Sequence, residues 1–134
     1  MILGIDYGAS RTGFAISENG LIAGTLETFA EKNMNKVAEH AAELVLKHNI
    51  DKVVVGLPKN MDGSIGDSGK KAKRLAKLIK ELTGVKIILW DERLTTVSAH
   101  NLMNETNVRG QKRKDSVDKI AAAFILQSYL DSLK

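Results

Sequence analysis

The order of apolar segments along the chain constrains its fold more than any other feature of the sequence. Two short runs, ILGIDY at 2–7 and TGFAIS at 12–17, are followed by a third, LIAGTLETF, at 21–29. The second and third runs are separated by Glu18-Asn19-Gly20, which is typical of a hairpin turn. The first 29 residues therefore predict three sequential antiparallel strands.

The rest of the chain alternates between helical and strand-like patterns. Apolar residues at helical spacing predict helices over about 35–48, 67–82, 96–104 and 116–130. The runs DKVVVGLP at 51–58 and VKIILW at 85–90 predict strands, and VRGQKRK at 108–114 predicts a polar loop. Because VVV and IILW do not alternate with polar residues, these two strands are expected to be covered on both faces, as in a parallel sheet.

The element order predicts an α/β fold with a mixed sheet of five strands. Three strands are antiparallel, the others belong to parallel β-α units, and helices cover both faces. No repeat or linker divides the chain of 134 residues, so we expect a single domain over 1–134.

Composition excludes several classes of protein and leaves nucleic-acid binding open. Cysteine is absent, which excludes disulfides, thiolate metal sites and a cysteine nucleophile. No run of 18 apolar residues and no signal-peptide pattern occurs, so we expect a cytoplasmic protein without a membrane partner. Twenty Lys and Arg against 16 Asp and Glu give a net charge of +4, which is compatible with a polyanionic partner.

Three carboxylates stand where apolar elements begin or end. Asp6 interrupts the first strand, Glu92 follows the last strand, and Asp118 lies near the start of the last helix. Sites in α/β sheets form beyond the carboxyl ends of strands, where Asp6 and Glu92 should lie. Carboxylates that converge there repel one another unless a cation lies between them, and oxygen ligands suit Mg²⁺ or Mn²⁺. This pattern indicates phosphoryl-transfer chemistry.

A helical-wheel projection of the last helix predicts where Asp118 lies relative to its buried face. Its expected buried stripe places the acid at the flank, and the stripe comprises Val117, Ile120, Ala121, Phe124 and Ile125. Asp115 is expected to be the N-cap of this helix, with Asp118 at the N3 position.

Each acid also has a purely structural interpretation. Asp6 is compatible with a turn that starts before Gly8, and Asp91 and Glu92 are compatible with a solvated strand end that pairs with Arg93. The segment DYGASRTG has the glycine spacing of a P-loop, but Phe14 replaces its lysine, so a tight hairpin explains the glycines equally well.

Taken together, four segments resemble the YqgF family, which is also called RuvX. They are GIDYGASRTGFAIS at 4–17, VVVGLPKNMDGS at 53–64, WDERLTT at 90–96 and KRKDSVDKIAAAFILQSYLD at 112–131. The family is described as Holliday junction resolvases or as nucleases that mature the 5′ end of pre-16S rRNA. The resemblance spans nearly the whole chain and implies a ribonuclease H-like fold.

The resemblance implies a set of site residues. Asp6, Glu92 and Asp118 become the catalytic acids that bind Mg²⁺ or Mn²⁺, and Arg11 and Arg93 become phosphate contacts. Two positions, Thr12 and Glu18, depart from the usual residues of the family motif without removing a metal ligand. The resemblance assigns no role to Asp91 or Asp115.

Two basic segments are candidates for holding the substrate. One is the polar loop that precedes Asp118, which contains Arg109, Lys112, Arg113 and Lys114. The other is the charged face of the helix over 67–82, which contains Lys70, Lys73, Arg74, Lys77 and Lys80. Spaced lysines on a helix are also typical of a merely solvated face.

These observations predict a metal-dependent nuclease whose first candidate substrate is the 5′ end of pre-16S rRNA. Alternatives are a Holliday junction resolvase that acts on branched DNA, a non-catalytic nucleic-acid-binding module, and a phosphotransferase of the actin and sugar-kinase type. The phosphotransferases enclose a nucleotide between two domains, and this chain has the length of one. A monomer and a homodimer are both compatible with the sequence, and a junction resolvase needs two active sites.

Overall fold

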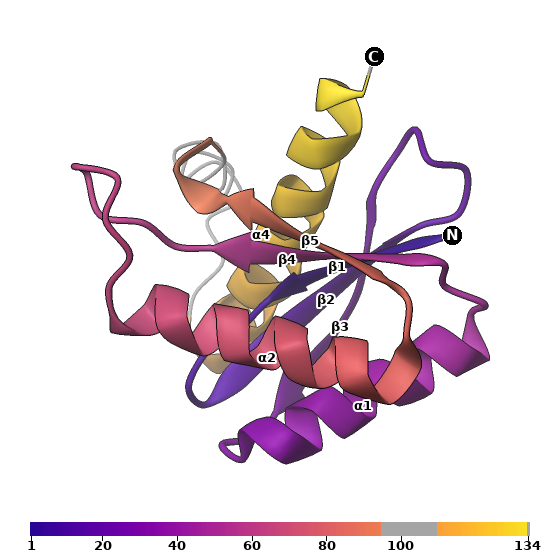
Figure 1. Cartoon of the computed structure of the whole chain (residues 1–134), viewed down its shortest axis with the longest axis horizontal. Coiled ribbons are helices and arrows are strands. Elements are labelled where there is room, and N and C mark those ends of the chain that lie inside the picture. Colours follow the sequence, from indigo (N-terminus) through magenta and orange to yellow (C-terminus); the bar gives the residue numbers. More distant parts are fainter. Residues whose placement is uncertain (95–109, 134) are drawn as a thin grey trace.

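A five-stranded mixed sheet forms the centre of the molecule. The computed structural model describes residues 1–94 and 110–133, and for residues 110–116 it describes the backbone alone. The strands are β1 (Ile2–Asp6), β2 (Arg11–Ser17), β3 (Gly24–Ala30), β4 (Lys52–Leu57) and β5 (Lys86–Asp91), in the order β3-β2-β1-β4-β5 (Figure 1). The first three pair antiparallel, whereas β4 and β5 run parallel to β1. The predicted sheet is therefore confirmed.

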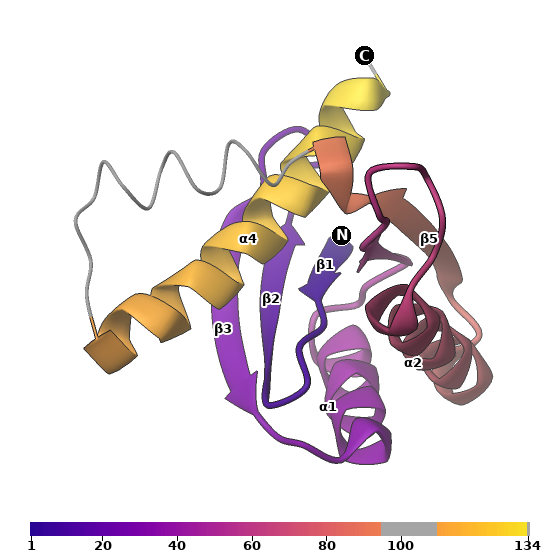
Figure 2. The ribbon, with the colours of Figure 1, turned by 90° about the vertical axis from the view of Figure 1, so that its left-hand side faces the viewer.

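Helices cover both faces of the sheet, as expected. The helices α1 (Met34–Lys47) and α2 (Asp67–Thr83) lie on one face, and α4 (Gly110–Ser132) crosses the other (Figure 2). A single 3₁₀ turn, η1 (Glu92–Leu94), follows β5 directly. The helix predicted over 96–104 lies outside the described residues. Within the described part of the chain, no helix is long and apolar enough to cross a membrane.

The alternation of side chains along β1 separates the core from the site. Leu3 and Ile5 are fully buried beneath α1 and α2. Gly4 and Asp6 point to the opposite face, where α4 lies, because successive side chains of a strand alternate between the two faces of a sheet. A half-buried acid therefore occupies the α4 side of the sheet at the carboxyl end of its first strand.

Local capping fixes where the two helices of the first face begin and end. The Asn33 side chain accepts hydrogen bonds from the backbone N–H groups of Asn35 and Lys36, at 2.9 and 3.3 Å, which satisfies free donors of the first turn of α1. Helix α2 ends at Gly84, whose φ of 74° is the left-handed conformation that glycine adopts without strain.

The third strand starts later than the sequence predicted. It was expected over 21–29, but β3 begins at Gly24. The Gln127 side chain accepts a hydrogen bond from the Ala23 N–H at 2.8 Å and donates one to the Leu21 carbonyl at 3.0 Å. These bonds hold the loop after β2 against α4 instead of in the sheet, a contact between residues about 100 positions apart.

The last helix starts earlier than predicted and exposes a different face. Helix α4 begins at Gly110, so the expected loop over 108–114 is helical from 110 onward and Asp115 is not an N-cap. Gln, Lys and Arg have good helix propensities, although a charged segment without apolar spacing resembles a loop. The buried residues of α4 are Ala122, Ile125, Leu126, Tyr129 and Leu130.

This correction changes the position of Asp118. Ile125 of the predicted stripe is buried as expected, whereas its other members are only half-buried and Ala122 is buried in their place. Ala122 and Ile125 lie four and seven residues beyond Asp118. Asp118 therefore lies in line with the buried face of α4, not at its flank. Apolar residues occur around most of this helix, so the wheel alone did not determine which face approaches the sheet.

Two glycines allow α4 to approach the sheet closely. A Cβ atom on Gly4 would lie 2.8 Å from the Cβ atom of Leu126, and one on Gly13 would overlap the carbonyl group of Asp118. Both obstacles involve atoms of the helix backbone or next to it, which cannot rotate away as the tip of a side chain can. The contact with Gly13 therefore sets how far Asp118 lies from the sheet.

We expect Gly13→Ala to lower the free energy of unfolding by about 3 kcal/mol or more, because the added methyl group must displace α4. Gly24→Ala is the matched control. Its Cβ would meet the Ile16 carbonyl oxygen at 3.9 Å, an ordinary contact, so its effect should stay within about 1 kcal/mol. Urea unfolding measures both values. Equal stability of the two variants would contradict this account of the packing.

Candidate active site at the carboxyl edge of the sheet

A row of three residues on neighbouring strands forms the floor of the candidate site. Asp6 ends β1 and lies opposite Gly13 on β2. On the other side, Ile5 lies opposite Val55 of β4, so Asp6 and Gly56 are the residues that follow this pair. The single acid of the row thus lies between two positions without side chains, where other parts of the chain can approach the sheet closely.

The second acid, Asp118, reaches the row from α4. Its backbone lies directly over Gly13, and its carboxylate oxygen Oδ2 lies 3.4 Å from Nε of Arg11. Arg11 is the first residue of β2, and both side chains are about one quarter exposed, at 23% and 24%. The Arg11 side chain is therefore partly exposed, so a bound anion could contact its guanidinium group.

The third acid, Glu92, lies over the other glycine of the row. A Cβ atom on Gly56 would lie 2.9 Å from Oε1 of Glu92 and 2.7 Å from Cδ1 of Ile125. Glu92 is the first residue of η1, where the chain turns away from the end of β5. Because Gly56 has no side chain, the carboxyl group of Glu92 can lie next to Asp6.

The carboxyl groups of Glu92 and Asp118 both act on Asp6. Burial, a hydrogen bond with the Glu92 side chain, and the charges of Glu92 and Asp118 raise the pKa of Asp6 well above its usual value. The folded protein therefore binds the Asp6 proton more tightly than an ordinary aspartate does. All three acids that the sequence singled out are brought together in this way.

The turn that carries Glu92 is held by its neighbour Asp91. Oδ1 of Asp91 accepts a hydrogen bond from the backbone N–H of Arg93 at 3.0 Å. Its carboxylate also receives the guanidinium group, with Nη2 at 2.8 Å and Nε at 3.0 Å from Oδ2. These bonds with Arg93 lower the pKa of Asp91. Asp91, whose role the sequence left open, thus fixes both the turn and the direction of Arg93.

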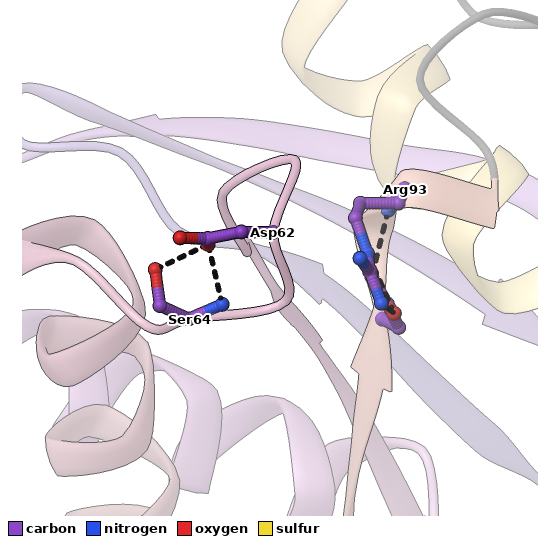
Figure 3. A network of polar contacts seen from close by, with 4 residues as sticks. Asp62, Ser64 and Arg93 are labelled. Carbon is purple, nitrogen blue, oxygen red and sulfur yellow. Dashed lines mark hydrogen bonds and ion pairs between the residues drawn. The ribbon is translucent and has the colours of Figure 1, made fainter.

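A loop after β4 borders the same edge. Figure 3 shows Asp62 and Ser64 of this loop beside Arg93, and a Cβ atom on Gly63 would lie 3.8 Å from Nη1 of Arg93. Hydrogen bonds from the Ser64 hydroxyl and N–H, at 2.6 and 2.9 Å, lower the pKa of Asp62. The segment NMDGS therefore forms part of the wall next to Arg93.

The structure treats the predicted cationic residues differently. Arg11 lies beside Asp118, and Arg93 lies at the rim in its pair with Asp91. Arg109 lies outside the described residues. Lys112, Arg113 and Lys114 belong to the first turns of α4, and their side chains lie outside the described part of the structure.

Sequence reasoning missed the importance of Gly13 and Gly56. Gly13 was interpreted as a hairpin residue and Gly56 as the end of a strand. The available signal was a glycine inside a strand, which often marks a close approach of another backbone or side chain.

Among the described residues, no three His, Cys, Asp or Glu side chains are already arranged as a group that could hold a metal ion. The contacts of the acids give a physical reason for this arrangement. The Asp6 and Glu92 side chains are joined by a hydrogen bond, and the Asp118 carboxylate faces Arg11. Both contacts occupy carboxylate oxygens, so a cation would have to compete with them.

Comparisons with known proteins agree with this fold. The family model RuvX, described as Holliday junction resolvase, matches residues 1–132. A protein of Bacillus cytotoxicus named "Putative pre-16S rRNA nuclease" is 47% identical over 134 residues, covering 98% of each chain.

Two solved structures have the same fold at low sequence identity. RuvC of Thermus thermophilus in complex with a Holliday junction substrate has a TM-score of 0.65 and 13% identity, covering 99% of this chain and 96% of that one. The Fowlpox virus resolvase with Holliday junction DNA has a TM-score of 0.58 and 16% identity, covering 98% and 97%.

We expect Asp6→Asn to stabilise the protein in the absence of divalent cations. A raised pKa means that the folded state binds the Asp6 proton more tightly than the unfolded state. The corresponding stability is present below the ordinary carboxyl pKa of about 4 and is lost as the pH rises through the raised value. Asparagine cannot ionise, so the gain in the thermal midpoint should grow from about pH 4 upward.

Thermal unfolding in EDTA across this pH range measures the effect. Glu18→Gln removes the same charge from an exposed loop position and serves as the control. A variant Asp6→Asn that was no more stable than the wild type at any pH would contradict the assigned electrostatics.

A second prediction concerns the turn at Asp91. Asp91→Asn retains an oxygen that can accept the Arg93 N–H, whereas Asp91→Ala removes it. We expect the Arg93 amide hydrogen to exchange about fivefold faster in Asp91→Ala than in Asp91→Asn, the factor that corresponds to about 1 kcal/mol. Amide exchange followed by NMR gives the rates, and equal rates would show that Asp91 does not hold the turn.

Proposed function

This chain belongs to the RuvX family, and on that premise we propose that it is a metal-dependent nuclease that processes the 5′ end of pre-16S rRNA. The relatives that carry this activity in their names support the choice of substrate. Their similarity extends over the full length of the chain, with 47% and 43% identity in proteins of Bacillus cytotoxicus and Clostridium botulinum. The reaction class is hydrolysis of a phosphodiester bond.

The observation that carries the proposal is the raised pKa of Asp6 between Glu92 and Asp118. A fold has no structural reason to bury a carboxyl group at a strand end beside two others, since the arrangement costs free energy in desolvation and repulsion. Clustered carboxylate oxygens are the donors that Mg²⁺ and Mn²⁺ prefer. The donor set therefore fits a hard divalent cation, with Asp6, Glu92 and Asp118 as its ligands.

A divalent cation bound there supplies the positive charge that makes water a better nucleophile and stabilises the departing oxygen. The chain's own residues do the remaining work. Asp6 would hold the cation through its carboxylate, because a positive charge there would offset the burial and repulsion that raise its pKa. Gly13 and Gly56 have no side chains, so the backbone of Asp118 and the carboxyl group of Glu92 can lie close to Asp6.

Two arginines are proposed to hold the phosphate backbone. Arg11 faces the opening beside Asp118, so its guanidinium group can receive the oxygens of the scissile or adjoining phosphate. Arg93 is held by Asp91 through Nε and Nη2, with Nη1 on the side of the loop that contains Gly63. Arg109, Lys112, Arg113 and Lys114 remain proposed contacts from the segment that precedes Asp118.

A junction resolvase is the second candidate function. The description of the family model and the likeness to RuvC and the Fowlpox virus enzyme favour it. Both candidates would use the same acids, because both hydrolyse a phosphodiester bond. The acids do not distinguish RNA from DNA, since phosphate contacts carry no base information. Junction resolution requires two active sites, so a protein that is a monomer in solution and on the substrate would favour the RNA.

We expect cleavage with Mg²⁺ or Mn²⁺ by the wild type, and a loss of at least about 100-fold in Asp6→Asn, Glu92→Gln and Asp118→Asn. The substrates are an RNA that spans the 5′ end of 16S rRNA in its precursor and a four-way DNA junction. Glu39→Gln, an exposed acid on α1, is the control and should cleave like the wild type.

Undiminished cleavage in all three site variants would remove these acids from the mechanism. A folded wild type that cleaves neither substrate would overturn the proposed activity and favour a non-catalytic binding module. Preferential cleavage of the junction would assign the second candidate function.

A further inference from the structure

The net positive charge of the chain is concentrated in one helix. The 17 residues of α2 contain six basic residues, Lys70, Lys71, Lys73, Arg74, Lys77 and Lys80, against two acids, Asp67 and Glu81, a net charge of +4. The whole chain also has a formal charge of +4, from 20 basic and 16 acidic residues. The 14 basic and 14 acidic residues outside α2 therefore cancel, and α2 accounts for the excess.

Most of this charge serves no structural purpose in the described part of the chain. Lys80 donates to the carbonyl oxygens of Gly84 and Val85, at 3.3 and 3.1 Å, and so caps the end of the helix. Lys70, Lys73 and Lys77 are exposed, and residues 1–94 and 117–133 give them no hydrogen bond or ion pair. Their charge is therefore available to a partner.

These side chains form one continuous surface. An open hollow of about 560 Å³ is lined by Lys70, Lys73, Arg74, Lys77, Leu78 and Glu81. Positions 70, 73 and 77 follow one another at helical spacing, so the three lysines share a stripe about 10 Å long, seven residues at about 1.5 Å each. Glu81, the only acid of the lining, ends the stripe on the side toward the C-terminus of the helix.

The stripe starts at the edge of the sheet that contains the carboxylates. Helix α2 begins after the loop that follows β4, and this loop lies against Arg93 at Gly63. Figure 1 shows the start of α2 at the same end of the sheet as the carboxyl ends of β4 and β5, and Figure 2 views that edge directly. A strand that leaves the acids past Arg93 would therefore cross the loop and reach Lys70 first.

From this arrangement we propose that the α2 stripe, defined as Lys70, Lys73, Arg74 and Lys77, binds the phosphate backbone of the nucleic-acid substrate beside the cleavage site. Four cations around one half-buried leucine suit a chain of phosphates better than a single small anion. The contact rests on the proposed nuclease function and adds a second holding surface to it. It reads no bases, so it fixes the position of the substrate and contributes affinity that depends on salt.

The test is the salt dependence of binding, measured without cleavage in EDTA. The variant Lys70→Ala/Lys73→Ala/Lys77→Ala removes three charges and retains good helix propensity. We expect the slope of log K against log salt concentration to become shallower by about 2 to 3 for the precursor RNA, with a smaller change for a single-stranded control. Thermal midpoints verify that the variant is folded.

A matched control removes the same charge elsewhere. Lys32, Lys36 and Lys47 are exposed residues at or near α1, and their triple alanine variant should keep the slope of the wild type. An α2 variant with an unchanged slope would overturn the proposal, and so would an equal change in both variants, because the effect would then come from net charge alone.

Additional binding measurements identify the class of partner. They also distinguish a failure of this proposal from a failure of the proposed nuclease function. A four-way DNA junction that shows the same change as the RNA supports a backbone contact, whereas tight binding of polyglutamate through the same lysines would overturn it in favour of an acidic protein. Absence of cleavage by the wild type concerns the proposed function alone, since the slope is measured on binding. Normal cleavage with an unchanged slope would reject the α2 stripe alone.

Discussion

The contact between α4 and a glycine-lined face of the sheet is the constraint on which the site depends. Gly4, Gly13 and Gly56 lie on three neighbouring strands and have no side chains to keep the helix away. The helix backbone consequently lies close to the strands at Asp118, and the Glu92 side chain fits over Gly56. The position of two acids relative to the third is therefore set by main-chain contacts, which vary less than contacts between long side chains.

The same arrangement places a cost on the fold. Asp6 lies beside Glu92 and Asp118, and its pKa is raised by desolvation, by a hydrogen bond with Glu92 and by the charges of both acids. Arg11 offers a positive group here, through its ion pair with Asp118. The large aliphatic core beneath α1 and α2, with Leu3, Ile5 and Val55, supplies stability on the opposite face.

The sequence predicted much of this structure because its strongest signals were local. Apolar runs identified all five strands, and the positions of Asp6 and Glu92 at strand ends identified two of the acids. The position of Asp118 near the start of the last helix identified the third acid, and the family resemblance added Arg11 and Arg93. The predicted start of the third strand was wrong because it depends on a contact distant in sequence. Gln127 of α4 holds the loop before β3 through hydrogen bonds.

The last helix shows the limit of pattern reasoning more clearly. Its apolar residues occupy several faces, so the wheel favoured Ala121 where the glycine-lined sheet selects Ala122. Its basic start resembled a loop, although the chain is helical from Gly110. The role of Asp91 was also hidden, since its bonds to Arg93 depend on a turn that only the folded chain forms.

The three acids belong to segments that lie far apart along the chain, at positions 6, 92 and 118. No single hairpin or β-α unit contains two of them, so a partly folded intermediate cannot assemble the site from local structure. Detachment of α4 alone would remove Asp118 and open the space above Gly13. Under the proposed function, nuclease activity depends on the completion of folding, because a chain whose last helix has not docked lacks one of the three acids.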